Sequence, residues 1–546
     1  MVAEIDYKNS IKMSTEETSK LTGTEPVASS GTGGGTTEHD ILGDSPAKTI
    51  GWFGSLSLVA NNISGPAMMG LPIVFREAGI IPTTLCILTT WIMSSLCGTF
   101  LAETIQKLPG NENFEKNVDF SYIFSKVVGK QWHLRCEVLV IFSCAVCCFA
   151  GIVETAQSLD SWLASFVLGK TYAVTIPGME FITWDASGCR GETEGGPHDE
   201  SGTGDCTPFH LVDSCVITLG YVLTFAFFYP LGRNDLSETI WAQILTFLLM
   251  FLLIMQFMRE FASTGYPYMD SVPMVGNNFK TLAGVVLFNY AYPVTIPSWL
   301  IEKKCDVPVN KIIWTASFTS TVMYIAFGVL AAASFDSPGE NILVVLASNK
   351  TAPATQFASA FFGISEIGVG VAIFCVIVKN SLLQTGLLNK GLSQFFGSLF
   401  PYLISWYMYQ GKSLLVMLNW TGLLVNGLVA FILPLVLALV AYRCGYGPKS
   451  RSKSSDSIGG DIEMLNKNAG RYDYQSIETP DDVLPTGEEE EEDEGGELDV
   501  IEPLPNFMEP CRGMVLIFGI FIFSFMIVST VILDVEYNAT PDTRRF

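Results

Sequence analysis

The stretch VANNISGPAMMGLPIVF, residues 59–75, combines an apolar composition with residues that interrupt helices. Gly65, Pro66, Gly70 and Pro72 lie within it, and two asparagines precede them. In hydrocarbon an unpaired backbone group costs several kcal/mol, so an unwound segment is stable at membrane depth only where protein or a ligand satisfies it. The stretch therefore predicts a discontinuous membrane span.

The composition predicts a polytopic membrane protein. Hydrophobic residues make up 49% of the chain and charged residues 16%. Many apolar runs reach the ~20 residues that cross a bilayer. We expect an all-α fold with eleven spans, at residues 52–75, 80–104, 134–160, 211–230, 238–258, 281–301, 311–333, 356–379, 394–410, 417–441 and 513–534.

The positions of Lys and Arg predict a cytosolic N-terminus. With this orientation, 22 of the 31 basic residues fall on the cytosolic side, which normally retains them. An odd number of spans then places the C-terminus outside. Sequons at Asn349, Asn419 and Asn538 fall on outer segments, and we take Asn349 and Asn538 as the predicted glycosylation sites.

The chain divides into four predicted parts. They are a disordered cytosolic tail (1–47), a ten-span core (48–442), an acidic disordered cytosolic loop (443–512), and the eleventh span with a short outer tail (513–546). The loop holds 18 acidic and seven basic residues, so it contributes -11 of the net charge of -23. It is interpreted either as a flexible linker or as a docking site for sorting or regulatory proteins.

The cysteines fall into two groups. Cys144, Cys147 and Cys148 lie within the third predicted span, where a thiol packs as a small hydrophobe. Cys189 and Cys206 lie in a polar outer loop on the oxidising side, which predicts a disulfide bond between them.

A second span is also interrupted. In LAGVVLFNYAYPVTIPSWLIEKK, residues 282–304, Pro293 and Pro297 follow a run of aromatic and polar residues. Broken helices in the first and sixth spans indicate an inverted repeat of five plus five helices, with a binding site at the breaks near the midplane. The alternative is that these prolines only kink ordinary packed helices.

The first-span motif resembles a known family. GPAMMGLPIVFREAG, residues 65–79, is similar to the first-helix signature of the amino acid/auxin permease family, in the amino acid, polyamine and organocation superfamily. Residues 51–441 follow that family's layout, whereas Pro66 and Ala67 replace its usual Thr and Gly. The resemblance implies a LeuT-like bundle that transports amino acids by alternating access, without a cofactor and coupled to H+ or Na+.

The two breaks offer complementary charges to an amino acid. N–H groups freed between Ser64 and Met68 suit its carboxylate, and carbonyls near Asn289 and Tyr290 suit its ammonium group. Tyr290 and Tyr292 either close over the substrate or only pack. The predicted substrate-binding residues are Ser64, Gly65, Ala67, Met68, Gly70, Asn289, Tyr290 and Tyr292.

Two carboxylates lie within predicted spans. Glu366 is about ten residues, or ~15 Å, into the eighth span, near the middle of a ~30 Å core. An ionised carboxylate there costs ~2.5–3.5 kcal/mol, so Glu366 is the predicted ion-coupling residue. The alternative is a protonated packing element. Glu154, on the third span, is predicted to have a structural role or to form a gate hydrogen bond.

These features predict a transporter in the plasma membrane or an endolysosomal or vacuolar membrane. The alternative is a nutrient sensor that binds an amino acid and signals through the acidic loop. An enzyme is disfavoured because the sequence has no metal motif, nucleophile elbow or phosphate-binding loop. The expected partners are an amino acid and the lipid bilayer, without a metal ion or nucleic acid.

Overall fold

A computed structural model describes most of the hydrophobic part of the chain. It covers residues 48–108, 110–116, 118, 120–129, 131–185, 208–209, 212, 215–233, 240–348, 351–384, 388–409, 413–443, 501–505 and 507–539. The N-terminal tail, Cys189, Cys206 and Asn349 lie outside these residues, as does the acidic loop up to residue 500. The predictions that concern them stay predictions.

Nine of the eleven predicted spans correspond, within the described residues, to helical segments long and apolar enough to cross a membrane. The first of them is the bent pair Trp52–Ile63 and Pro66–Ala78. The other eight are Ile80–Gln106, Gln131–Val167, Gln243–Thr264, Leu282–Glu302, Val309–Ser334, Pro353–Leu383, Leu415–Arg443 and Glu509–Ile532. The chain is therefore a helical polytopic membrane protein.

The other two predicted spans are helical but short or irregular. α7 (Leu219–Leu231) has 13 residues. At ~1.5 Å per residue it is about 20 Å long, less than a ~30 Å hydrocarbon core. The ninth predicted span consists of the consecutive short elements α15 (Lys390–Gln394), η9 (Phe395–Leu399), α16 (Phe400–Ser405) and η10 (Trp406–Met408).

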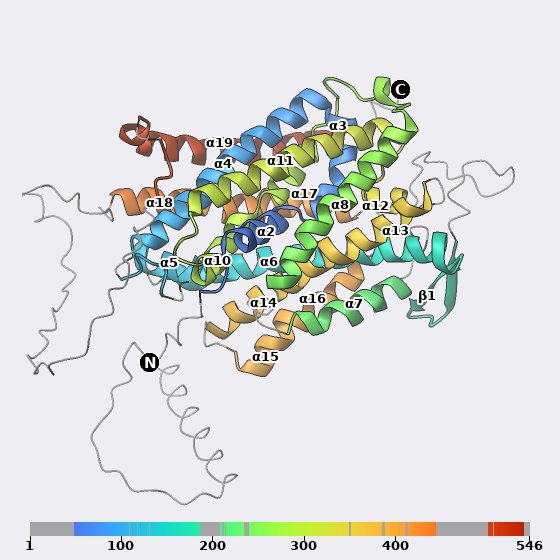
Figure 1. The fold of residues 1–546 in the computed structure, drawn as a ribbon, viewed down its shortest axis with the longest axis horizontal. Coiled ribbons are helices and arrows are strands. Elements are labelled where there is room, and N and C mark those ends of the chain that lie inside the picture. The colour runs from blue at the N-terminus through green and yellow to red at the C-terminus, as the bar shows by residue number, and fades with distance from the viewer. Residues whose placement is uncertain are drawn as a thin grey trace, which may run out of the picture. The chain divides into compact units, whose positions relative to one another are not determined.

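Long helices form the body of the protein. Figure 1 shows α4 (Ile80–Gln106), α6 (Gln131–Trp162), α8 (Ile240–Thr264) and α11 (Val309–Ser334) as long rods. Besides η9 in the ninth predicted span, π-helical segments occur in three of the long apolar spans. These are α6–η3 (Leu163–Val167); α13 (Pro353–Phe362), η8 (Gly363–Gly368) and α14 (Val369–Gln384); and α17 (Ser413–Thr421), η11 (Gly422–Ile432) and α18 (Leu433–Arg443).

Shorter helices lie in the connections. They are α5 (Phe120–Val127), η6 (Met269–Ser271), α12 (Ile342–Leu346) and η12 (Glu509–Cys511). α5 packs against α6, and α12 packs against α13 and α6.

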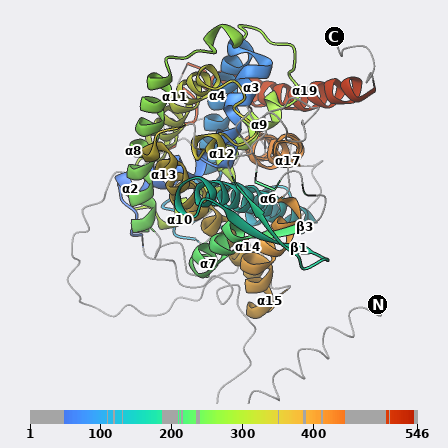
Figure 2. The ribbon, with the colours of Figure 1, turned by 90° about the vertical axis from the view of Figure 1, so that its right-hand side faces the viewer.

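A small antiparallel sheet follows α6, so the all-α prediction was wrong for this segment. β1 (Thr171–Ile176) lies between β2 (Phe181–Trp184) and β3 (Cys215–Thr218). In the register, Thr171 faces Trp184 and Ala173 faces Thr218. Along β1, buried positions alternate with more exposed ones, which is the pattern of a half-buried strand. Figure 2 shows the sheet from the side, beside α6 and α7.

Asp160, near the end of α6, anchors this sheet. Its Oδ1 accepts hydrogen bonds from Thr171 Oγ1 (2.6 Å) and from the backbone N–H of Gly220 (2.8 Å). Its Oδ2 accepts a hydrogen bond of 2.6 Å from the hydroxyl of Tyr409. A single carboxylate therefore links β1, the start of α7 and the end of the ninth predicted span.

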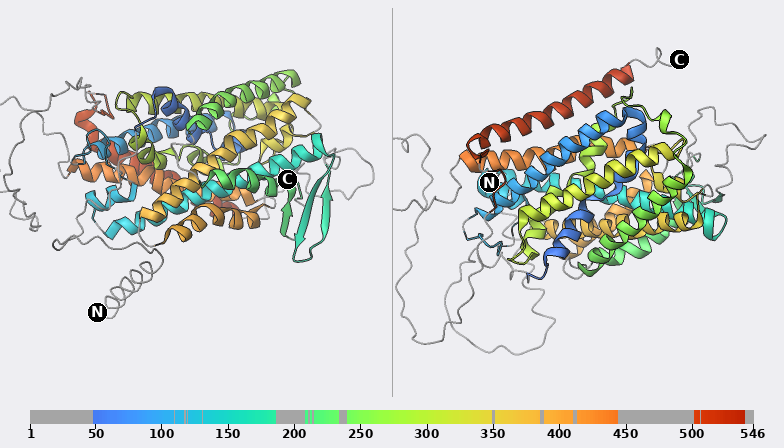
Figure 3. Two further views of the ribbon diagram at one scale, coloured as in Figure 1. Left: turned by 60° about the horizontal axis from the view of Figure 1, so that its bottom comes forward. Right: turned by 45° about the horizontal axis from the view of Figure 1, so that its top comes forward.

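α19 (Arg512–Ala539), the eleventh span, is the least buried of these spans. Figure 3 shows it as the red helix along one side of the bundle. The guanidinium group of Arg512 donates to both carboxylate oxygens of Glu103 on α4, and Nζ of Lys107 lies 2.6 Å from Oε1 of Glu103. Such bidentate pairs fix geometry as well as charge.

Residues 501–505, near the end of the predicted acidic loop, pack against the helices. Ile501 and Leu504 are buried. The N–H of Ile501 donates to Oε1 of Gln106 (3.1 Å), and Nδ2 of Asn310 donates to the carbonyl of Glu502 (2.7 Å). Residues 501–505 therefore contact the ends of both α4 and α11.

Asn419, whose sequon had been assigned to an outer segment, is buried within a helix. It is in α17 and only 2% of its surface is exposed. α17 packs on α9 (Leu282–Asn289), where a Cβ at Gly284 would come within 2.2 Å of the Asn419 carbonyl oxygen. This close contact leaves no room for a glycan. Asn538 lies within α19.

Candidate functional site

The first span is interrupted at the predicted position. α2 (Trp52–Ile63) ends at Ser64, a 3-10 turn η2 (Pro66–Gly70) follows, and α3 (Leu71–Ala78) leaves at an angle of 50°. Local acceptors satisfy several of the N–H groups here. The backbone N–H of Ser64 donates to the carbonyl of Ala60 (2.9 Å), and that of Gly65 to the carbonyl of Ile63 (2.7 Å). The N–H of Met68 donates to the carbonyl of Gly65 (3.2 Å).

The sixth span is interrupted in the same way. α9 ends at Asn289, a 3-10 turn η7 (Tyr292–Thr295) follows, and α10 (Ile296–Glu302) completes the span. The second residue of η7 is Pro293, and the first residue of η2 is also a proline. The hydroxyl of Ser94 on α4 donates a hydrogen bond of 2.8 Å to the carbonyl of Tyr290.

The two broken spans lie antiparallel to each other. α9 packs against η2, and α2 packs against η7. At one end, Ile50 exchanges backbone hydrogen bonds with Glu302 (3.1 Å) and Lys304 (2.9 Å). At the other end, Nδ2 of Asn278 donates to Oε2 of Glu77 (3.1 Å). The two interruptions therefore meet halfway along the pair.

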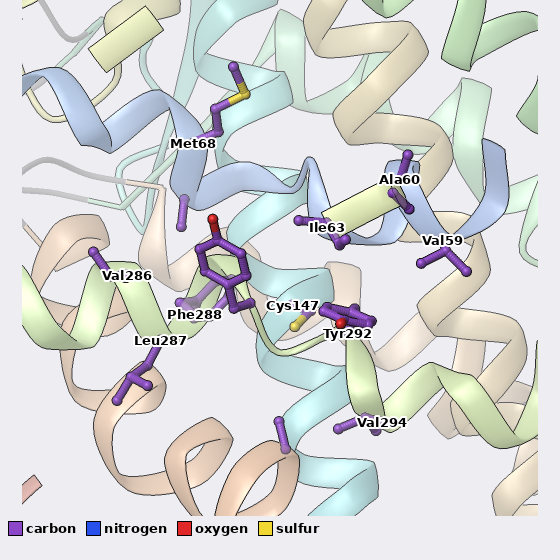
Figure 4. Packing of buried hydrophobic residues seen from close by; sticks show 14 of the residues in the cluster. Val59, Ala60, Ile63, Met68, Cys147, Val286, Leu287, Phe288, Tyr292 and Val294 are labelled. Carbon is purple, nitrogen blue, oxygen red and sulfur yellow. The ribbon is translucent and has the colours of Figure 1, made fainter. Parts of the chain in front are cut away.

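A cavity lies where the interruptions meet. Its walls come from both broken spans, from α6 and from α14. Figure 4 labels five of the residues that line it: Ile63, Cys147, Phe288, Tyr292 and Val294. The cavity volume is about 20 Å³, which is enough for about one water molecule. The lining residues are Asn62, Ile63, Gly65, Pro66, Ser143, Cys144, Cys147, Phe288, Ala291, Tyr292, Val294 and Phe374.

Of the predicted substrate-binding residues, Gly65 and Tyr292 line this cavity. Ser64 and Asn289 are buried beside the breaks. Ser64 Oγ and Asn289 Oδ1 have no hydrogen-bond partner among the described residues. Buried polar atoms of this kind normally have partners. Neither residue lines the cavity itself.

The other predicted residues have packing environments. Ala67 and Met68 are fully buried and do not line the cavity. A Cβ at Gly70 would lie 3.4 Å from Leu415. The hydroxyl of Tyr290 lies 2.5 Å from Oγ1 of Thr321, and its ring packs edge-on against Tyr324. For Tyr290 this geometry favours the packing interpretation.

Sequence reasoning missed the walls contributed by α6 and α14. Ser143, Cys144 and Cys147 come from α6, and Phe374 from α14. The hydroxyl of Ser143 donates a hydrogen bond of 2.6 Å to Oδ1 of Asn426. These residues sit in ordinary apolar helical runs, so no local signal distinguished them from core positions.

Glu366 lies in the π-helical segment η8 and is buried. Oγ of Ser365 lies 3.4 Å from its Oε1. η8 packs against α6, α7 and α8, and Glu366 is not part of the cavity wall. Among the described residues, no group of three or more His, Cys, Asp or Glu side chains is arranged to hold a metal ion.

Residues 48–182 match the sequence profile of the Tryptophan/tyrosine permease family. This match corrects the expected identity as an amino acid/auxin permease. The motif behind that expectation consists mainly of Gly, Pro and apolar residues, which any interrupted first span requires, so it did not discriminate between families. No curated protein sequence matches the chain.

Several solved structures resemble the fold. One is Mhp1, a nucleobase-cation-symport-1 family transporter, in a closed conformation with bromovinylhydantoin bound, at 11% identity, 74% coverage of this chain, 81% of that chain and a TM-score of 0.50. Another is inward-facing Mhp1, at 10% identity, with 74% of this chain and 78% of that chain covered and a TM-score of 0.49. A third is a manganese transporter mutant from Eremococcus coleocola, at 10% identity, with 91% of this chain and 98% of that chain covered and a TM-score of 0.38. The chain is thus similar to a permease family over residues 48–182 and to a transporter in its fold, and neither likeness is to an enzyme.

Proposed function

We propose that this protein is a secondary active transporter that moves amino acids by alternating access. The observation that carries the proposal is the antiparallel pair of broken spans, with a cavity at the point where both are unwound. Transporters use this arrangement because unwound backbone and helix ends bind polar groups without a buried ionised side chain.

The proposed architecture is a LeuT-like inverted repeat of five plus five helices. The first and sixth spans share the order helix, break, proline-containing 3-10 turn, helix. They lie five predicted spans apart and run in opposite directions, as two halves related by a two-fold axis in the membrane plane require.

An amino acid main chain fits the charges at the breaks. α2 and α9 end there, and their C-terminal carbonyls favour an ammonium group. α3 and α10 begin just beyond the breaks, and their N-termini favour a carboxylate. Ser64 Oγ and Asn289 Oδ1 provide further polar contacts.

The cavity wall favours an apolar or aromatic side chain. Phe288, Tyr292 and Phe374 contribute aromatic surface, and no ionised side chain lines the cavity. The profile match is to a family named for tryptophan and tyrosine, so aromatic amino acids are the first substrates to test. The present volume of about 20 Å³ is too small for them, so the cavity must widen to bind such a substrate.

Glu366 is the proposed site for a coupling cation, H+ or Na+. It is buried, and among the described residues its hydrogen-bond contact is the hydroxyl of Ser365. Binding of a cation would neutralise the carboxylate and bias the equilibrium between the two open states.

A sensor with the same pocket is the alternative function. It would bind an amino acid without appreciable transport and signal through the acidic loop, which also remains the proposed docking site for sorting or regulatory proteins. Purified protein in proteoliposomes distinguishes the two, with a panel of radiolabelled amino acids. Accumulation in the lumen supports the transporter, whereas saturable binding without accumulation supports the sensor.

A further inference from the structure

Glu154 on α6 is a buried carboxylate without a partner. Its exposed fraction is 0%, and neither Oε1 nor Oε2 has a hydrogen-bond partner among the described residues. The gate hydrogen bond, one of the two roles that the sequence predicted for Glu154, is therefore not present among the described residues.

Three other buried carboxylates among the described residues have well-defined partners. Asp160, six residues later on the same helix, accepts three hydrogen bonds. Glu103 is held by Arg512 and Lys107. Oε2 of Glu260 accepts a hydrogen bond of 2.6 Å from the hydroxyl of Thr355. Glu154 differs from these three because neither of its oxygens has a partner among the described residues.

Glu154 lies on the stripe of α6 that reaches the cavity. Cys147, which lines the cavity, precedes it by seven residues, which is about two turns or ~10 Å along the helix axis. The neighbouring residue Thr155 faces η8, because its hydroxyl donates a hydrogen bond of 3.0 Å to the carbonyl of Gly363. Opening of the cavity along α6 would therefore bring water toward Glu154.

Within the part of the chain that the structure describes, no cationic side chain is bonded to Glu154. Six of the elements packed against α6, namely η2, η3, η11, α12, α13 and α17, contain no titratable residue. Lys379 on α14 donates to the carbonyl of Arg233, and Lys126 on α5 lies over the ring of Tyr122.

The remaining titratable residues on elements packed against α6 are Glu366 on η8, Tyr221 and Tyr229 on α7, Cys375 on α14, Tyr402 on α16, Tyr407 on η10 and Tyr122 on α5. On α6 itself they are His133, Arg135, Cys136, Glu137, Cys144, Cys147, Cys148 and Asp160, and Tyr409 beyond η10 is bonded to Asp160.

The ligand that fits this environment is a proton. An ionised carboxylate without partners costs several kcal/mol in a protein interior, whereas the neutral acid avoids most of this cost. A metal cation prefers several oxygen ligands. Glu154 offers a lone carboxylate.

We propose that Glu154 is a proton-binding site that loads and releases the proton moved together with the substrate. When water reaches the carboxylate from one side of the membrane, a hydronium ion transfers one proton to it and leaves as water. The closed conformation then holds the neutral acid. Opening to the other side returns the proton to water and leaves the carboxylate. This inference rests on the proposed transport function and adds a second acidic residue to the predicted role of Glu366.

The test uses the full-length protein in lipid vesicles and three variants. Glu154→Gln keeps the size and removes the titration, whereas Glu154→Asp keeps a carboxylate. Thr155→Val is the matched control, because it changes a neighbouring side chain without a titratable group. The first readout is the infrared C=O stretch of protonated carboxyl groups near neutral pH. We expect Glu154→Gln to lose part of this band, and Thr155→Val and Glu154→Asp to keep it.

The second readout is amino acid accumulation driven by a pH gradient. The wild-type protein and Thr155→Val should accumulate substrate, whereas Glu154→Gln should lose accumulation and keep exchange of labelled for unlabelled substrate. An unchanged infrared band in Glu154→Gln, or accumulation by this variant with the wild-type pH dependence, overturns the proposal. If the wild-type protein neither accumulates nor exchanges any amino acid, the transport function fails. The infrared band then still decides whether Glu154 binds a proton.

Discussion

Nδ2 of Asn62 donates a hydrogen bond of 3.0 Å to Oγ1 of Thr295, and this contact joins the two broken spans at their midpoints. The hydroxyl of Thr295 in turn donates a hydrogen bond of 2.9 Å to the carbonyl of Tyr292. Asn62 and Tyr292 both line the cavity. Movement of one span relative to the other must therefore break or stretch a bond in the cavity wall.

Thr295→Val should alter transport because it removes the acceptor for Asn62 and preserves the side-chain shape. Loss of one hydrogen bond is worth roughly 0.5–1.5 kcal/mol, which corresponds to a roughly 2- to 12-fold change in rate. The measurement is the initial rate of amino acid uptake. Thr319→Val is the control, because its exposed hydroxyl bonds only to the Thr315 carbonyl of the same helix. Equal rates in both variants would show that the bond does not contribute to the transport cycle.

Gly65→Val should abolish uptake without preventing membrane insertion. The φ angle of Gly65 is -87°, and an added Cβ would meet only the Ile63 carbonyl oxygen, at 3.9 Å. The backbone therefore accepts a side chain, but that side chain occupies a cavity that must admit the substrate. The measurement is uptake normalised to the amount of inserted protein. Pro72→Ala, which alters the start of α3 outside the cavity, should have a milder effect. Unchanged uptake in Gly65→Val would place the site elsewhere.

Glu366→Gln should uncouple transport from the ion gradient. It preserves size and hydrogen bonding and removes the titratable charge, so concentrative uptake should be lost while exchange survives. The measurement compares accumulation under an imposed H+ or Na+ gradient with exchange at equilibrium. Accumulation with the wild-type ion dependence would leave Glu366 as a protonated packing element.

The predicted orientation can be tested in sealed right-side-out vesicles. A cytosolic N-terminus and an odd number of spans predict that external protease spares residues 443–512. An epitope placed after Arg545 should be accessible to antibody from outside. Finding the loop and the epitope on the same side would contradict the eleven-span topology, including the assignment of α7 as a complete span.

The sequence predicted the parts of the site that depend on local backbone chemistry. Gly65, Pro66 and Pro293 disfavour continuous helix at those positions, so both breaks lie where they were expected. It did not predict which other helices would close the cavity. Cys147 lines the cavity and Cys148 packs beside Cys375, yet both occupy equivalent apolar surroundings in the sequence.

Two other differences come from tertiary packing. The β1 strand shows alternation over only six residues, and it lies in a loop that the hydropathy pattern assigned as a polar connection. Asn419 carries a sequon. Gly284 has no side chain, so α17 packs close to α9 and Asn419 is buried. A sequon records a chemical possibility, whereas accessibility depends on neighbours that are distant in the sequence.

The most direct test of the central claim, that the cavity between the broken spans binds the transported amino acid, is the alkylation rate of Cys147. Mass spectrometry of peptides from protein treated with a small membrane-permeant maleimide measures each cysteine separately. Cys148 is the internal control, since its Sγ lies 3.7 Å from Sγ of Cys375 and it does not line the cavity. We predict that a saturating transported amino acid slows alkylation of Cys147 and leaves the rate at Cys148 unchanged. An equal rate at Cys147 with and without that amino acid would contradict the account.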